Sequence, residues 1–298
     1  MNAAGKTEEV IFYEGNPSFG EITYGKVTGR FVTVYDKNGN KTEKCQYGIY
    51  GELCRKETWK YDTNKNVTEK CKYDSEGRLY KKNVHKYDSN NNEIEKITYD
   101  TNGNLVKKTI YIYDSNNNGI EKSMYNPDGS LMRKDTYEYD TNDNIIAICS
   151  LDSEGSMAYR ITYNYDSNKN IIAICTYNSD GIMIGKDTCE YDTNNRDIEI
   201  CEYIKDEVLV HKATKKYDSN DREIETNAYN SKGEFDYKIT REYDTEDNII
   251  EQCIYNSDGT LRSKNTYEYD TNNNMVERTY FYEEGVLTGG TIIEYKYW

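Results

Sequence analysis

Histidine is almost absent from this chain, which has only His85 and His211. No Ser/His/Asp set, phosphate-binding glycine loop or paired-histidine metal motif accompanies them. We expect both histidines to be surface residues of strands. The sequence therefore predicts a protein that is not an enzyme.

Long apolar runs and an excess of positive charge are also lacking. No segment approaches the roughly 20 apolar residues of a membrane-spanning helix, and residues 1–20 have no secretory pattern. The net charge is -15, and affinity for nucleic acid comes largely from Lys and Arg on phosphates. We expect no membrane span and no nucleic-acid partner; the acidic balance is compatible with cations or basic partners.

Tyrosine is abundant, with 32 in 298 residues, and it recurs at a fixed spacing of 26. We number each repeat from this tyrosine as position 0. Position 12 is usually Tyr, position 16 Gly, position 18 apolar and position 21 basic. The repeat tyrosines are Tyr35, Tyr61, Tyr87, Tyr113, Tyr139, Tyr165, Tyr191, Tyr217, Tyr243, Tyr269 and Tyr295.

Each repeat carries two turn signals. Asn126-Pro127-Asp128-Gly129 is typical of a type I turn followed by a left-handed residue, which closes a hairpin. The other turn, Asp-Thr/Ser-Asn-x-Asn, uses the tolerance of Asn for the left-handed region. We expect the short loop to pair Tyr125 with Leu131. A longer first loop would pair Tyr113 with Ile120, so that an identical face in every repeat needs a bulge, or else a shorter first loop.

These signals predict an all-β fold, an elongated antiparallel β-meander of ten 26-residue hairpin repeats. A parallel β-solenoid is the alternative. The predicted organisation is a cap and half repeat at 1–34, the repeats at 35–294 and the end of a closing strand at 295–298. Residues 1–20 are expected to cap the first sheet edge.

YDTNGNL (Tyr99 to Leu105), YDSEGRL (Tyr73 to Leu79) and the returns YEYD and YIYD resemble the YD or RHS repeats of bacteria. The resemblance covers about Tyr35 to Tyr295. It implies an all-β scaffold, often in surface, secreted or toxin-associated proteins, and it implies no catalytic residue.

Eight cysteines are present, six of them at position 10. Equivalent positions in a meander lie two strands apart, about 9.6 Å, which is beyond the roughly 7 Å Cα limit for a disulfide. We expect free, half-buried thiols, which favour a reducing compartment. The absent signal peptide also favours the cytoplasm, whereas the resemblance implies a surface or secreted protein, so the compartment stays open.

The first turn has alternating oxygen ligands that resemble the start of a calcium loop. The candidates are Asp88, Asn90, Asn92, Asp114, Asn116 and Asn118. Hydrogen-bonded Asx turns explain the same residues and are the favoured reading. No other cofactor is expected.

The pattern breaks in two adjacent repeats, which read IIAIC where most repeats read Ile-Glu. Both faces of these strands are then apolar, and exposed apolar patches tend to be contact sites. The candidate patch is Ile145, Ile146, Ile148, Leu151, Ile171, Ile172, Ile174, Ile182 and Ile184. Coverage of this region by the sheet's curvature or by residues 1–20 is the alternative.

Two functions follow as hypotheses. The first is a non-enzymatic repeat scaffold that binds a protein partner or itself through an extended sheet surface. The second is a glycan or cell-wall binding module that uses rows of exposed tyrosines, Tyr111, Tyr137 and Tyr163, as stacking platforms.

Overall fold

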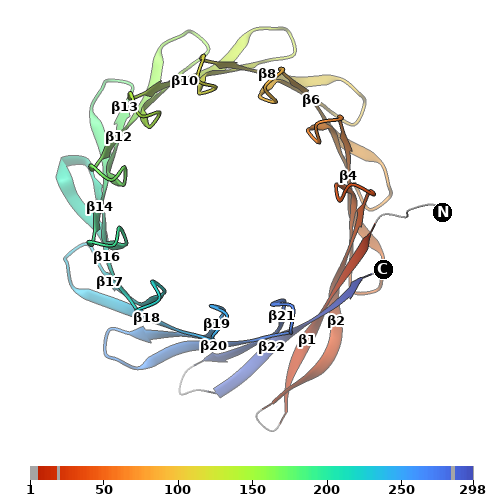
Figure 1. The fold of residues 1–298 in the computed structure, drawn as a ribbon, viewed down its shortest axis with the longest axis vertical. Coiled ribbons are helices and arrows are strands. Elements are labelled where there is room, and N and C mark those ends of the chain that lie inside the picture. The colour runs from red at the N-terminus through yellow and green to blue at the C-terminus, as the bar shows by residue number, and fades with distance from the viewer. Residues whose placement is uncertain (1–5, 19–20, 283–285, 298) are drawn as a thin grey trace.

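The strands form one closed ring (Figure 1), seen in a computed structural model that describes residues 6–18, 21–282 and 286–297. A single sheet contains 22 strands, each antiparallel to its sequence neighbours. The ring closes because the first strand, Thr7–Ser18, pairs with both the second strand and the last. The all-β prediction is confirmed. The elongated, open form of the meander is wrong, because its two edge strands, β1 and β22, pair with each other and leave no open edge. The parallel solenoid is wrong because neighbouring strands are antiparallel.

The strands are β1 (Thr7–Ser18), β2 (Glu21–Tyr35), β3 (Lys41–Tyr47), β4 (Leu53–Tyr61), β5 (Val67–Tyr73), β6 (Leu79–Tyr87), β7 (Glu93–Tyr99), β8 (Leu105–Tyr113), β9 (Gly119–Tyr125), β10 (Leu131–Tyr139) and β11 (Ile145–Leu151). The others are β12 (Met157–Tyr165), β13 (Ile171–Asn178), β14 (Met183–Tyr191), β15 (Asp197–Ile204), β16 (Val208–Tyr217), β17 (Glu223–Tyr229), β18 (Phe235–Tyr243), β19 (Ile249–Asn256), β20 (Leu261–Tyr269), β21 (Met275–Tyr282) and β22 (Val286–Tyr297). A 3₁₀ turn, η1 (Lys205–Glu207), stands where one repeat lacks its glycine.

The two turns of a repeat share one backbone geometry. In both, the first residue donates to the carbonyl of the fifth, and the fourth donates to the carbonyl of the first, as at Asp100–Asn104 and Asp114–Asn118. The fourth residue is left-handed: Gly103 has φ 79° and Asn117 has φ 66°. Glycine, asparagine and aspartate tolerate this conformation best, and they occupy most of these positions, with Lys65 and Lys169 as exceptions.

The register confirms one predicted pair and corrects another. Tyr125 pairs with Leu131 as expected. Tyr113 pairs with Gly119 instead of Ile120, and Ile120 is the extra residue of a bulge. A second bulge follows the other turn, so each repeat has two bulges and the same residues return to the same face.

The ring is a single layer, because the substantial contacts between elements are those between neighbouring strands. Strand spacing and tilt make a ring of this strand number on the order of 40 Å across. Figure 1 shows the curled first turns toward the centre of the ring and the other hairpins flaring outward. Among the described residues, no helix is long and apolar enough to span a membrane.

Candidate partner-binding surface

One face of the sheet, the ion-pair face, carries positions 8, 10, 12 and 21 of the repeats. The position 8 glutamates accept from lysines on the strands at either side. Glu69 lies 2.8 Å from Lys60 and 2.6 Å from Lys82, and Glu95 is held in the same way by Lys86 and Lys108. Hydrogen bonds from these lysines lower the pKa of both glutamates. Positive and negative charge are therefore matched locally on this face.

The opposite face, the aromatic face, carries positions 9, 11, 20, 22 and 24. Direct cross-strand pairs place Tyr137, Ile148 and Ile161 in one row. Tyr163 follows Ile161 on the same side of β12 and pairs with Ile174. Further apolar residues lie on this face in the next repeats, with Asp187 between Ile174 and Ile200. We call the whole set the apolar arc: Ile148, Ile161, Ile174, Ile200, Ala213, Ala228, Ile239 and Ile254.

The sequence-derived patch is divided by the structure. Ile148 and Ile174 lie on the aromatic face, whereas Leu151 pairs with Lys134 on the ion-pair face. Ile182 lies in a turn and Ile184 at the start of β14, near the other rim.

The remaining patch residues lie at the starts of β11 and β13. Ile146 and Ile172 are the bulged residues there, 36% and 38% exposed, and Ile145 and Ile171 precede them. Similar exposure at Ile94 and Ile120 shows that exposed bulge residues belong to several repeats and do not distinguish this region.

The three tyrosines proposed as stacking platforms lie on the aromatic face. Tyr137 and Tyr163 flank the isoleucines of the apolar arc, and Tyr111 pairs with Lys122 one repeat earlier. All three are half-buried instead of fully exposed. Burial raises the pKa of Tyr111 to about 12. The three tyrosines predicted for glycan stacking thus share one surface with two residues of the predicted contact patch, Ile148 and Ile174.

A second set of residues on the aromatic face escaped the sequence reasoning. From β3 to β10 the face is basic, and we call this set the basic arc: Lys44, Arg55, Lys70, Lys72, Lys81, Lys96, Lys107, Lys122 and Arg133. Lysine at position 9 in four successive repeats, from Lys44 to Lys122, was the available signal. The net charge of the whole chain concealed it.

The first turns, proposed as weak calcium sites, are filled with internal hydrogen bonds. In the turn of Asp88, one carboxylate oxygen accepts from the backbone N–H groups of Asn90 and Asn92, and the other accepts from the Asn92 amide. Asp114 accepts from Asn116 and Asn118 in the same way. No group of three or more metal-ligating side chains occurs among the described residues. The carboxylate oxygens serve the turn, and calcium binding stays a prediction.

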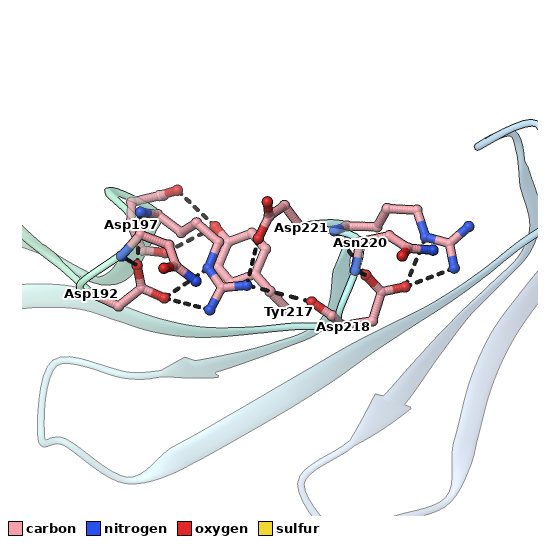
Figure 2. A network of polar contacts seen from close by, with 9 residues as sticks. Asp192, Asp197, Tyr217, Asp218, Asn220 and Asp221 are labelled. Carbon is pink, nitrogen blue, oxygen red and sulfur yellow. Dashed lines mark hydrogen bonds and ion pairs between the residues drawn. The ribbon is translucent and has the colours of Figure 1, made fainter.

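Adjacent first turns are also tied to each other around the rim. Asn90 and Asn92 donate to Oδ1 of Asn117, the left-handed residue of the next turn. Arg196 donates to Oδ1 of Asp221, and its guanidinium lies 4.9 Å from the centre of the Tyr217 ring (Figure 2). Seven such links join successive turns, starting at Asn66, Asn92, Asn118, Asn170, Arg196, Arg222 and Asn248.

All eight cysteines are free. Cys45, Cys71, Cys201 and Cys253 are buried at position 10 of the ion-pair face. Burial, followed by a hydrogen bond to Glu251, raises the pKa of the Cys253 thiol. The histidines are on the aromatic face: Nδ1 of His85 lies 2.6 Å from Glu93, and His211 pairs with Glu202.

No family model matches the chain, and no curated protein matches it. Among solved structures, the chain is similar to the Photorhabdus luminescens Tc holotoxin pore, with 12% identity and a TM-score of 0.35 over 88% of this chain and 19% of that chain. It is similar to a TcdB2–TccC3 complex with 12% identity and a TM-score of 0.33 over 96% of this chain and 20% of that chain.

The chain is also similar to a porin-like protein from Bacteroides uniformis, with 11% identity and a TM-score of 0.34 over 99% of this chain and 96% of that chain. The chain spans about a fifth of the length of the toxin chains that it matches. These likenesses are distant, and no assignment of function is drawn from them.

Proposed function

We propose that the protein is a non-enzymatic repeat scaffold of the YD/RHS type that binds a protein partner, or a second copy of itself, through the apolar arc. One observation carries the proposal. Tyr137, Ile148 and Ile161 pair directly across three strands, with Tyr163 and Ile174 beside them, on a face that no second layer covers among the described residues. Contiguous apolar surface of this kind favours burial against another protein.

The neighbouring repeats support the proposal by contrast. The residues at position 9 before the apolar arc are Lys96 and Lys122, and the residues within it are Ile148 and Ile174. A sheet that needed only to close would tolerate lysine throughout, since four repeats have it. The change to isoleucine therefore favours a role in binding over a role in closure.

The test replaces Ile148 and Ile174 together by Lys. Ile94→Lys with Ile120→Lys is the control, because these isoleucines are 37% and 36% exposed at bulges outside the arc. We expect the arc variant to lose self-association in light scattering, or binding of an apolar fluorescent dye where the parent is a monomer. The control should keep both. An arc variant that associates and binds dye like the parent would contradict the proposal.

Glycan binding through Tyr111, Tyr137 and Tyr163 is the second candidate, favoured by their recurrence at position 24 on one face. The same experiment separates the two functions when Tyr137→Ala with Tyr163→Ala is added. Loss of polysaccharide binding with unchanged self-association would favour the glycan.

A further inference from the structure

The basic arc is a concentration of positive charge in an acidic protein. Its nine cations face the same side from β3 to β10, because each is linked to the others by direct cross-strand pairs or by two-residue steps along a strand. The acids between them in the strand interiors are Glu57 and Asp135.

Most of these cations are not neutralised. Glu57 pairs with Lys70 and Lys72, and Asp135 pairs with Arg133. Within the described part of the chain, no ion pair occurs at the other six: Lys44, Arg55, Lys81, Lys96, Lys107 and Lys122. The lysines of the ion-pair face show the opposite, since Lys86, Lys108 and Lys134 each hold a glutamate within 2.6 Å.

Two ring side chains within the basic arc, Trp59 and His85, are already engaged. Lys41 and Lys70 lie over the Trp59 ring, 5.6 and 5.0 Å from its centroid. His85 is bound to Glu93 and its side chain is only 11% exposed. Nucleic-acid bases and sugar rings need free aromatic faces for stacking. Trp59 and His85 offer none, so the part of the arc around them suits a ligand that is recognised by charge, whereas Tyr111 beside Lys122 is half-buried.

We infer that the basic arc binds an acidic, extended polypeptide segment of a partner protein. Lysine ammonium groups are flexible point charges, well suited to the separate carboxylates of Asp and Glu. The position 9 lysines lie two strands apart, about 10 Å, which matches one turn of an extended polyproline II chain, about 9.3 Å for three residues, so that every third side chain faces the arc. Four such lysines, from Lys44 to Lys122, span about 30 Å, the length of roughly nine extended residues.

The inference deepens the proposed scaffold function by naming a partner chemistry, yet it uses a different part of the aromatic face. The two sites therefore fail separately. Ile148→Lys with Ile174→Lys should leave peptide binding intact, and the basic-arc variant below should leave self-association intact.

The experiment measures binding of a fluorescein-labelled peptide of about 12 residues, with Glu at every third position and Ser between, by fluorescence anisotropy at low and physiological salt. The arc variant is Lys96→Gln, Lys107→Gln and Lys122→Gln, which breaks no ion pair. The matched control is Lys86→Gln, Lys108→Gln and Lys134→Gln, which makes the same change in net charge on the other face. Circular dichroism establishes that each variant keeps the parent's fold.

We expect the parent to bind the peptide, the arc variant to bind at least about tenfold more weakly, and the control to bind within about threefold of the parent. Equal weakening in both variants, or no binding by the parent, would overturn the inference. Tighter binding of single-stranded oligothymidylate or polygalacturonate than of the peptide would also overturn it. If the arc variant without peptide differs from the parent in oligomeric mass, the basic arc would bind a second copy of the chain, and the inference would be overturned.

Discussion

The basic arc and the apolar arc occupy the same face of one sheet, at the same repeat positions, with opposite chemistry. Lys96 and Lys122 are succeeded by Ile148 and Ile174 at position 9, and Lys107 and Arg133 are succeeded by Tyr159 and Gly185 at position 20. The backbone register is the same in both arcs. The comparison shows that turn geometry and backbone pairing suffice to build the ring, so that one face is free to vary.

The ion-pair face also changes between the repeats of the basic arc and those of the apolar arc. Glu95 and Glu121 at position 8 give way to Ala147 and Ala173. Arg160, which would otherwise face a position 8 glutamate, turns to Glu138 at 3.3 Å. The local charge matching is therefore rearranged behind the apolar arc.

The largest expected effect is a difference in stability between two variants, each with an aspartate of position 22 replaced by alanine. Asp135 is 4% exposed and accepts from Nε of Arg133 at 2.7 Å, whereas Asp187 lies within the apolar arc, where no described cation pairs with it. Asp135→Ala should destabilise the fold by about 1–3 kcal/mol, since it leaves Arg133 without its carboxylate. Asp187→Ala should be neutral or stabilising in urea unfolding. Equal losses would show that the two arcs are not different environments.

A smaller effect of opposite sign is expected from pH. The Asp187 residue is exposed overall, but loss of water around its carboxylate, and then the negative charge of Glu202, raise the pKa of that carboxylate. The folded state then holds the proton more tightly than the unfolded chain, so ionisation above about pH 4 opposes folding. Asp187→Asn should raise the melting temperature at pH 7, and the gain should vanish near pH 3.

Asp192 provides the matched case in a turn. A side-chain hydrogen bond from Arg196 lowers its pKa, so its stabilisation is present above the unfolded value near 3.9 and is lost as the pH falls below it. Asp192→Asn should lower the melting temperature at pH 7, with the difference shrinking as the pH falls below the unfolded value and disappearing once the pH has passed the lowered pKa of the folded state. Parallel pH profiles for the two variants in thermal unfolding would contradict both assignments.

The smallest effect concerns two places where the hydrogen bond between neighbouring first turns is missing, one near the basic arc and one near the apolar arc. Lys65 and Lys169 occupy the left-handed position of their turns, with φ 67° and 69°. Neither side chain offers an oxygen to the preceding turn. Lys65→Asn and Lys169→Asn should each stabilise the fold by roughly 0.5 kcal/mol, because Asn favours this conformation and supplies the missing acceptor. Chemical unfolding of the single and double variants measures this, and Asn91→Lys should have the reverse effect.

The repeat, the antiparallel strands and the Tyr125–Leu131 register followed from local signals, namely the period of 26 and the Asx and Gly turns. Closure did not, because it depends on the pairing of β1 with β22, and β1 lies in a segment that lacks the repeat. The shared face of Tyr137 and Ile148 depends on bulges that shift parity by one residue. The basic arc was concealed because a summed charge says nothing about which face carries it.

The pairing of β1 with β22 places Glu8 opposite Tyr297. In backbone terms, the junction between these two strands is then equivalent to any junction that a hairpin turn closes. The ring is accordingly suited to circular permutation: a short linker from Tyr297 to Glu8, with a new opening at a turn such as Gly103, would keep every paired strand.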